Sequence, residues 1–103
     1  MTKTVYEVYE LYTETKKTTK ALTADEAKAA LESVFMDNEK PRRTFDDREA
    51  AAAFVTDQGT GRIDDFGSYW RIHGWIVYEV DQTIEDGEVT DRMSIGTTTV
   101  SEF

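Results

Sequence analysis

Histidine changes its charge near neutral pH, and this chain has only one, His73. Acid–base or metal chemistry through a histidine would therefore have to use that residue. The chain has no cysteine, which excludes disulfides, thiolate zinc sites and cysteine nucleophiles. It also lacks the His-Glu-x-x-His spacing and a calcium loop of the Asp-x-Asp-x-Asp-Gly type. We therefore expect no catalytic residue, no metal and no cofactor.

The pair Asp64-Asp65 follows Gly59 and Gly61 closely. Carboxylates hold hard cations, and glycines let backbone amides approach a ligand, so these residues could form a pocket with His73. No Lys-Ser or Lys-Thr follows at the spacing of a phosphate-binding loop, and a solvated turn is the competing interpretation. The basic run 40–43 is short and lies beside acids, which indicates a solvated loop.

Acidic side chains dominate the charge. The chain has 21 Asp plus Glu against 12 Lys plus Arg, a net charge of -9. Residues 57–103 hold ten of the acids and only three of the arginines, whereas residues 1–56 are nearly balanced. Such a chain repels nucleic-acid phosphates and anionic lipids, so we expect neither direct nucleic-acid binding nor membrane binding. A basic protein surface is the natural complement.

The 103 residues are enough for one hydrophobic core. No Pro-rich or Ser-rich linker divides the chain, whose only proline is Pro41, so we expect one small acidic domain over 1–103. The start of the chain lacks the apolar stretch of a secretion signal, and no run of about 20 apolar residues could cross a membrane. Together with the lack of cysteine, this favours a cytoplasmic location. We expect the protein to be a monomer or a homodimer.

The first half of the chain predicts a strand and two helices. Residues 4–13 are β-branched and aromatic on both faces, which is typical of a central strand. Residues 18–22 could add a short strand. The box Thr23-Ala-Asp-Glu26 predicts a helix start, and 46–49 repeats this capping pattern before a second helix that ends before Gly59. The first helix would bury a stripe of Ala27, Ala30, Leu31, Val34 and Phe35, and the second would bury Ala50, Ala51, Phe54 and Val55.

The segments around these helices are expected to be irregular. We expect a loop over 38–43, an extended link over 43–45 and a glycine-rich turn over 59–67.

A β-hairpin is predicted at the C-terminal end, because Asp86-Gly87 is a preferred centre of a two-residue type I′ turn. The regular register of that turn places the apolar pairs on one face and the polar pairs on the other. The apolar pairs are Ile84 with Val89, Val80 with Met93 and Tyr78 with Ile95; the polar pairs are Asp81 with Arg92 and Thr83 with Thr90. Trp70, Ile72 and Ile76 would continue the apolar face.

These elements predict an α+β fold. The expected architecture is a mostly antiparallel β-sheet with two short helices packed on one face, ending in a long C-terminal β-hairpin. The other face of the hairpin would then present a row of Tyr69, Arg71, His73, Trp75 and Val77, continued by Glu79 and Asp81. Tyr, Trp and Arg are enriched in interface anchors. Alternatively, this row forms a second small core under another element.

The acids Asp81, Glu85, Asp86, Glu88 and Asp91 gather around the hairpin tip. In size and acidity the chain is similar to small proteins of phages and mobile elements that block restriction or CRISPR nucleases by mimicking nucleic-acid charge. The likeness implies a non-enzymatic inhibitor that docks on a nucleic-acid-binding protein. The candidate partner-binding residues are Tyr69, Arg71, His73, Trp75, Glu79, Asp81, Glu85, Asp86, Glu88 and Asp91. The alternative is a small ligand-binding domain or enzyme with a pocket near His73 and Asp64-Asp65.

Overall fold

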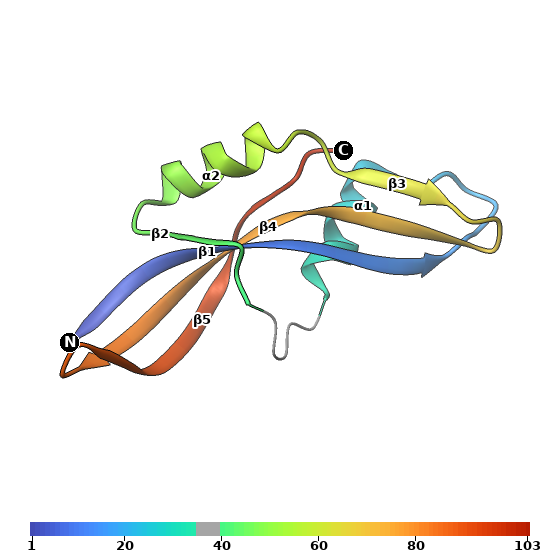
Figure 1. Ribbon diagram of the computed structural model, residues 1–103. Coiled ribbons are helices and arrows are strands. Elements are labelled where there is room, and N and C mark those ends of the chain that lie inside the picture. The colour runs from blue at the N-terminus through green and yellow to red at the C-terminus, as the bar shows by residue number, and fades with distance from the viewer. Residues whose placement is uncertain (35–39) are drawn as a thin grey trace.

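The computed structural model describes residues 1–34 and 40–103 and is a mostly antiparallel sheet with two helices, an α+β architecture (Figure 1). The strands follow the order β2-β1-β4, and β4 carries both β3 and β5 on its other edge. The elements in chain order are β1 (Thr2–Lys16), α1 (Ala24–Glu32), β2 (Arg43–Phe45), α2 (Arg48–Asp57), β3 (Arg62–Asp65), β4 (Tyr69–Glu85) and β5 (Glu88–Val100).

The long strands β1 and β4 form the centre of the sheet. They pair along the whole of β1, from Thr2 opposite Thr83 to Lys16 opposite Tyr69. The strand predicted over 4–13 is therefore confirmed and extends further at both ends. Three segments share the far edge of β4: β3 pairs with 70–73, Ser101 hydrogen-bonds to the backbone of Trp75, and β5 pairs with 76–85.

The turn at Asp86-Gly87 forms as predicted, with positive φ at both residues, and places Ile84 opposite Val89. Beyond that pair the predicted register is wrong. The register shifts three times along β5, so that Val80 lies opposite Ser94, and Asp81 lies opposite Met93 rather than Arg92. Each shift adds one residue to β5, as a β-bulge does. The shifts leave Thr90, Ile95 and Thr98 without a partner on β4 and also separate Tyr78 from Ile95 and Thr83 from Thr90.

Both helices begin at capping residues. At α1, the Thr23 hydroxyl accepts from the backbone of Glu26, and the Glu26 carboxylate accepts from the backbone of Thr23, so the predicted capping box is confirmed. At α2, the cap is Asp47 rather than Asp46, the first residue of the predicted 46–49 pattern, and its carboxylate accepts from the amides of Glu49 and Ala50.

The helices lie on opposite faces of the sheet, which corrects the prediction that both cover one face. From α1, Ala27 and Leu31 pack on Ile72 and Ile76. The α2 residues Ala51 and Val55 pack instead on Val8 and Val77, which face the other way. Since β1 and β4 carry apolar side chains on both faces, the sheet has two apolar surfaces to bury, and each helix covers one (Figure 1).

Other short segments differ from expectation. Residues 18–22 form no strand, and the stretch expected to be a glycine-rich turn contains β3 at Arg62–Asp65. The extended link over 43–45 is confirmed as β2, which pairs with β1. Of the predicted stripe, Phe35 lies outside the described residues, as do positions 38 and 39 of the predicted loop.

The molecule is elongated, with principal extents of 54 × 25 × 17 Å. Its radius of gyration is 15.3 Å, above the roughly 13 Å of a compact chain of this length. The excess length comes from the sheet, whose β4–β5 hairpin runs beyond α2 to the end of the molecule where the N-terminus lies (Figure 1). Two ends of the sheet are therefore available to position functional side chains.

Candidate functional site

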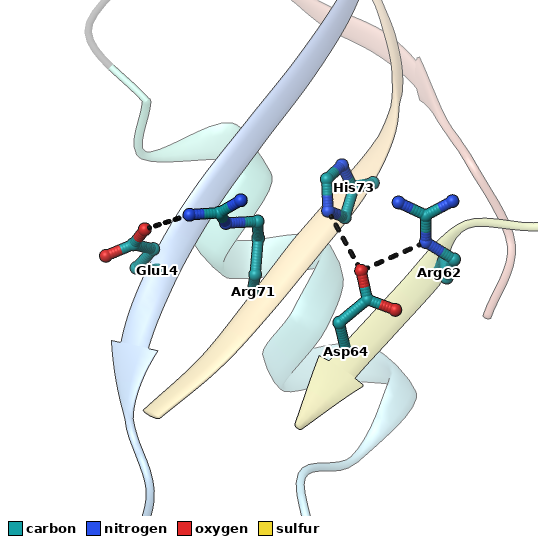
Figure 2. A network of polar contacts seen from close by, with 5 residues as sticks. All are labelled: Glu14, Arg62, Asp64, Arg71 and His73. Atoms are coloured by element: carbon teal, nitrogen blue, oxygen red, sulfur yellow. Dashed lines mark hydrogen bonds and ion pairs between the residues drawn. The ribbon is translucent and has the colours of Figure 1, made fainter. Parts of the chain in front are cut away.

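At the end of the sheet that carries β3, polar side chains gather on the face that is turned away from α1 (Figure 2). The strand register places Arg62 opposite His73 and Asp64 opposite Arg71. Asp64 Oδ2 lies 3.3 Å from His73 Nε2 and accepts a hydrogen bond of 3.1 Å from Arg62 Nε. The structure thus brings His73 and Asp64 together, as the pocket hypothesis requires.

Arg71 belongs to the same cluster. It donates to Glu14 Oε1 at 2.9 Å, and its guanidinium lies over the rings of Tyr12 and Phe66. The hydrogen bond that Arg71 donates to Glu14 raises the pKa of Arg71. Acids and bases therefore compensate each other in this cluster, which we call the polar end: Glu14, Arg62, Asp64, Arg71 and His73.

The neighbouring acid Asp65 does not join Asp64, which corrects the expectation of a two-carboxylate site. Successive residues of a strand point to opposite faces. Asp65 accepts from Lys17 Nζ at 2.6 Å and from the amide of Gly67 at 2.8 Å, and these bonds lower its pKa. Only one carboxylate of the pair is thus available to His73.

A pocket of about 290 Å³ opens beside the polar end. Tyr12, His73 and Trp75 line it from β1 and β4, and Thr60 to Arg62 line it from the segment that enters β3. The C-terminal Phe103 ring packs on Gly61, where a Cβ atom would lie 2.3 Å from the ring. A side chain at position 61 would therefore displace the Phe103 ring.

The predicted row on β4 is divided between two environments. Tyr69, Arg71 and His73 remain at the polar end, where Tyr69 stacks on Phe66 at 5.1 Å between ring centroids. Trp75 contacts Phe54 of α2 edge to face at 5.5 Å, and Val77 is fully buried. The interpretation as a second core thus holds for Trp75 and Val77, and Trp75 is not an exposed anchor.

The acidic candidates lie at the opposite end, on residues 79–95 of the hairpin, which we call the acidic arm. Glu79 accepts from the Tyr6 hydroxyl and Asp81 from the Thr4 hydroxyl. Glu85, Asp86, Glu88 and Asp91 are exposed, and none of these six acids forms an ion pair with any residue that the structure describes.

Arg92, the only basic residue of the arm, is turned toward β1. Its Nε donates to Glu7 Oε2 at 3.1 Å, its Nη2 donates to Glu7 Oε1, and Nη2 also reaches the Tyr9 hydroxyl at 3.0 Å. This pairing replaces the predicted contact of Arg92 with Asp81. The acids of the arm therefore form no ion pair with a described side chain, and the nearest positive group at the tip is the N-terminal ammonium, which donates to Ile84 O at 3.1 Å.

Glu7 is only 5% exposed, so its charge depends on these partners. Burial alone raises the pKa of the Glu7 carboxyl, but hydrogen bonds from Arg92 and Tyr9 hold it below its ordinary value of 4.5. The same burial, together with the Glu7 carboxylate, raises the pKa of Tyr9, which keeps its hydroxyl as a donor at 2.6 Å. This network ties the base of the arm to β1.

Three large apolar side chains of β5 are exposed among the acids, and the sequence interpretation missed them. Val89, Met93 and Ile95 are 53%, 63% and 52% exposed. The regular register assigned all three to the buried face, but the shifts place Met93 on the face of Asp81 and leave Ile95 unpaired. The extra residues at these bulges, Thr90 and Ile95, are neither glycine nor proline, so the sequence did not indicate the bulges.

In the described ranges 1–34 and 40–103, no group of three His, Asp or Glu residues could hold a metal ion. None of the helices in that part of the chain is long and apolar enough to cross a membrane. Comparison of the chain with family models, curated proteins and solved structures found no match.

Proposed function

We propose that the protein is a non-enzymatic interaction module that docks its acidic arm on a basic surface of another protein. One observation carries the proposal: Glu85 lies directly opposite Glu88 on the exposed end of the hairpin. Like charges in that position destabilise a strand pair. A binding role explains why two glutamates face each other at an exposed tip even though their repulsion reduces the stability of the hairpin.

The surroundings of this pair support the same function. Asp81, Asp86 and Asp91 add charge along the arm, and Arg92 is engaged by Glu7. Exposed Val89 and Met93 supply apolar area, which an interface buries alongside complementary charge. A partner surface rich in Lys and Arg, with apolar contacts between the charges, fits this composition.

The partner class that fits best is a nucleic-acid-binding protein, because its binding surface is already basic and spaced for phosphates. The protein would then act in the cytoplasm as an inhibitor that mimics nucleic-acid charge, as phage and mobile-element proteins do against restriction or CRISPR nucleases. It would do so without binding nucleic acid, metal or cofactor itself.

Replacing Glu85, Glu88 and Asp91 with Lys tests the proposal. Partners recovered by affinity capture from the source cell should fall at least tenfold, because the steering charge changes sign. Capture by the unmodified protein should weaken between 50 and 300 mM salt, since exposed charges are screened beyond about 8 Å at physiological ionic strength. Duplex DNA added to the extract should displace the captured partner.

A matched control replaces Asp25, Glu32 and Asp57 with Lys. These exposed acids lie on or beside the helices, and the change in net charge is the same. The arm variant keeps Asp86, whose φ of 53° suits Asp better than Lys, and keeps like charges at 85 and 88, so its melting temperature should stay close to that of the parent. Equal loss of capture in both variants, or in neither, would refute docking through the arm.

A second candidate function is small-ligand binding at the polar end. The contact between His73 and Asp64 beside a pocket of about 290 Å³ favours it. If it is correct, native mass spectrometry of protein purified from the source cell should show an added mass that His73→Ala removes. If each form shows only the mass of its own bare chain, this function is excluded.

A further inference from the structure

The outer edge of β5 has no backbone partner among the residues that the structure describes. Residues 88–95 pair with β4 on one side, and no other backbone segment of the described chain pairs with them. Figure 1 shows this part of β5 at the margin of the sheet, beyond α2. Eight residues of strand span about 26 Å. The N–H and C=O groups that point away from β4 along this edge form a template for another strand, whereas the Arg92 amide already donates to Asp91 Oδ1 at 2.8 Å.

Side chains along this edge indicate what could pair there. Exposed acids and exposed apolar residues are interleaved along it: Glu88, Val89, Asp91, Met93 and Ile95. A second copy of the chain would bring its own acids next to these, which disfavours self-pairing. An extended segment that interleaves Lys or Arg with apolar residues would match both the charges and the apolar contacts.

We infer that residues 88–95 capture their partner by β-strand addition, the added strand being an extended basic segment of the partner protein. The inference rests on the proposed function and deepens it, because it specifies how the partner binds. Main-chain hydrogen bonds along the edge would supply affinity, and Glu88 and Asp91 would select a basic strand. The apolar residues Val89 and Met93 would set the spacing of its apolar side chains.

The probe is a nine-residue peptide that alternates Lys and Val. Two modified forms are measured beside it, one N-methylated at every valine and the other at every lysine. Successive N–H groups of a strand point to opposite edges, so each form loses the donors of one edge and keeps its charge. At least one form should bind at least tenfold more weakly by fluorescence anisotropy. Amide exchange should slow in residues 88–95 when the unmodified peptide is bound.

Equal affinity of all three peptides, or slowed exchange outside 88–95, would refute strand addition. Concentration-dependent dimerisation of the protein alone, in sedimentation, would show that the edge pairs with a second copy and would also refute it. The two proposals fail separately. If charge reversal abolishes capture but N-methylation does not weaken the peptide, docking through the acidic arm stands and the strand-addition mode fails.

Discussion

Replacing Arg92 with Met should lower the free energy of unfolding by about 3 kcal/mol at pH 7. The guanidinium donates two hydrogen bonds to the carboxylate of Glu7, which is almost fully buried, and removing it leaves that charge unpaired. The figure lies at the lower end of the range for broken buried pairs, because the Arg92 side chain is 45% exposed. Urea denaturation measures the change.

The stability of the parent protein and that of the Arg92→Met variant should change with pH in opposite directions. In the parent, the pKa of Glu7 is below its ordinary value of 4.5, so the pair stabilises the fold above that pH and this contribution is lost as the pH falls further. Without Arg92, burial is expected to raise the pKa of Glu7 above its unfolded value. Stability of the variant then decreases as the pH rises from 4 to 7, and the difference between the proteins is smallest at low pH.

Two further variants isolate the role of Glu7. Adding Glu7→Gln to Arg92→Met should restore at least half of the lost stability at pH 7, because no charge is then buried. Arg42→Met changes the net charge by the same amount, but Arg42 and Glu10 form an exposed pair at 3.5 Å, so it should cost less than about 1 kcal/mol. Failure of Glu7→Gln to rescue the variant would show that Arg92 acts through packing alone.

Local signals in the sequence predicted the elements well. The capping box at Thr23 and the turn at Asp86-Gly87 each depend on residues a few positions apart, and both are confirmed. The contact between Glu7 and Arg92 joins residues 85 positions apart and depends on the register of β5. Because the bulge at Thr90 shifts the register at Arg92 without a Gly or Pro at the extra residue, the sequence could not place Arg92 beside Glu7.

The assignment of faces failed for a different reason. Alternation on β4 correctly separated Ile72 and Ile76 from Trp75 and Val77, and the structure buries Val80, as predicted. Both sets contain apolar residues, so the pattern does not say which set a helix covers. In the structure each face is covered by one helix. Trp75 therefore packs against α2 and is no longer a candidate interaction residue, whereas Arg71 and His73 remain at the polar end.

Val77→Asp distinguishes the two-faced arrangement from the single-faced one. Val77 is fully buried between β1 and α2, against Val8, Ala51 and Val55. An aspartate there would be an unpaired charge in a core and should cost about 4 kcal/mol or more, a large share of the roughly 5–15 kcal/mol that stabilises a domain. If both helices covered the other face, the same substitution would be tolerated.

Val77→Ala keeps the test informative if the aspartate variant does not fold, and it should cost roughly 2 kcal/mol. Thr90→Asp adds the same charge at an exposed position of the hairpin, where the free energy of unfolding should change by less than about 0.5 kcal/mol. Urea denaturation measures all three variants. An unchanged midpoint for Val77→Asp would mean that α2 does not pack on this face, and Trp75 would then return to the candidate interaction surface.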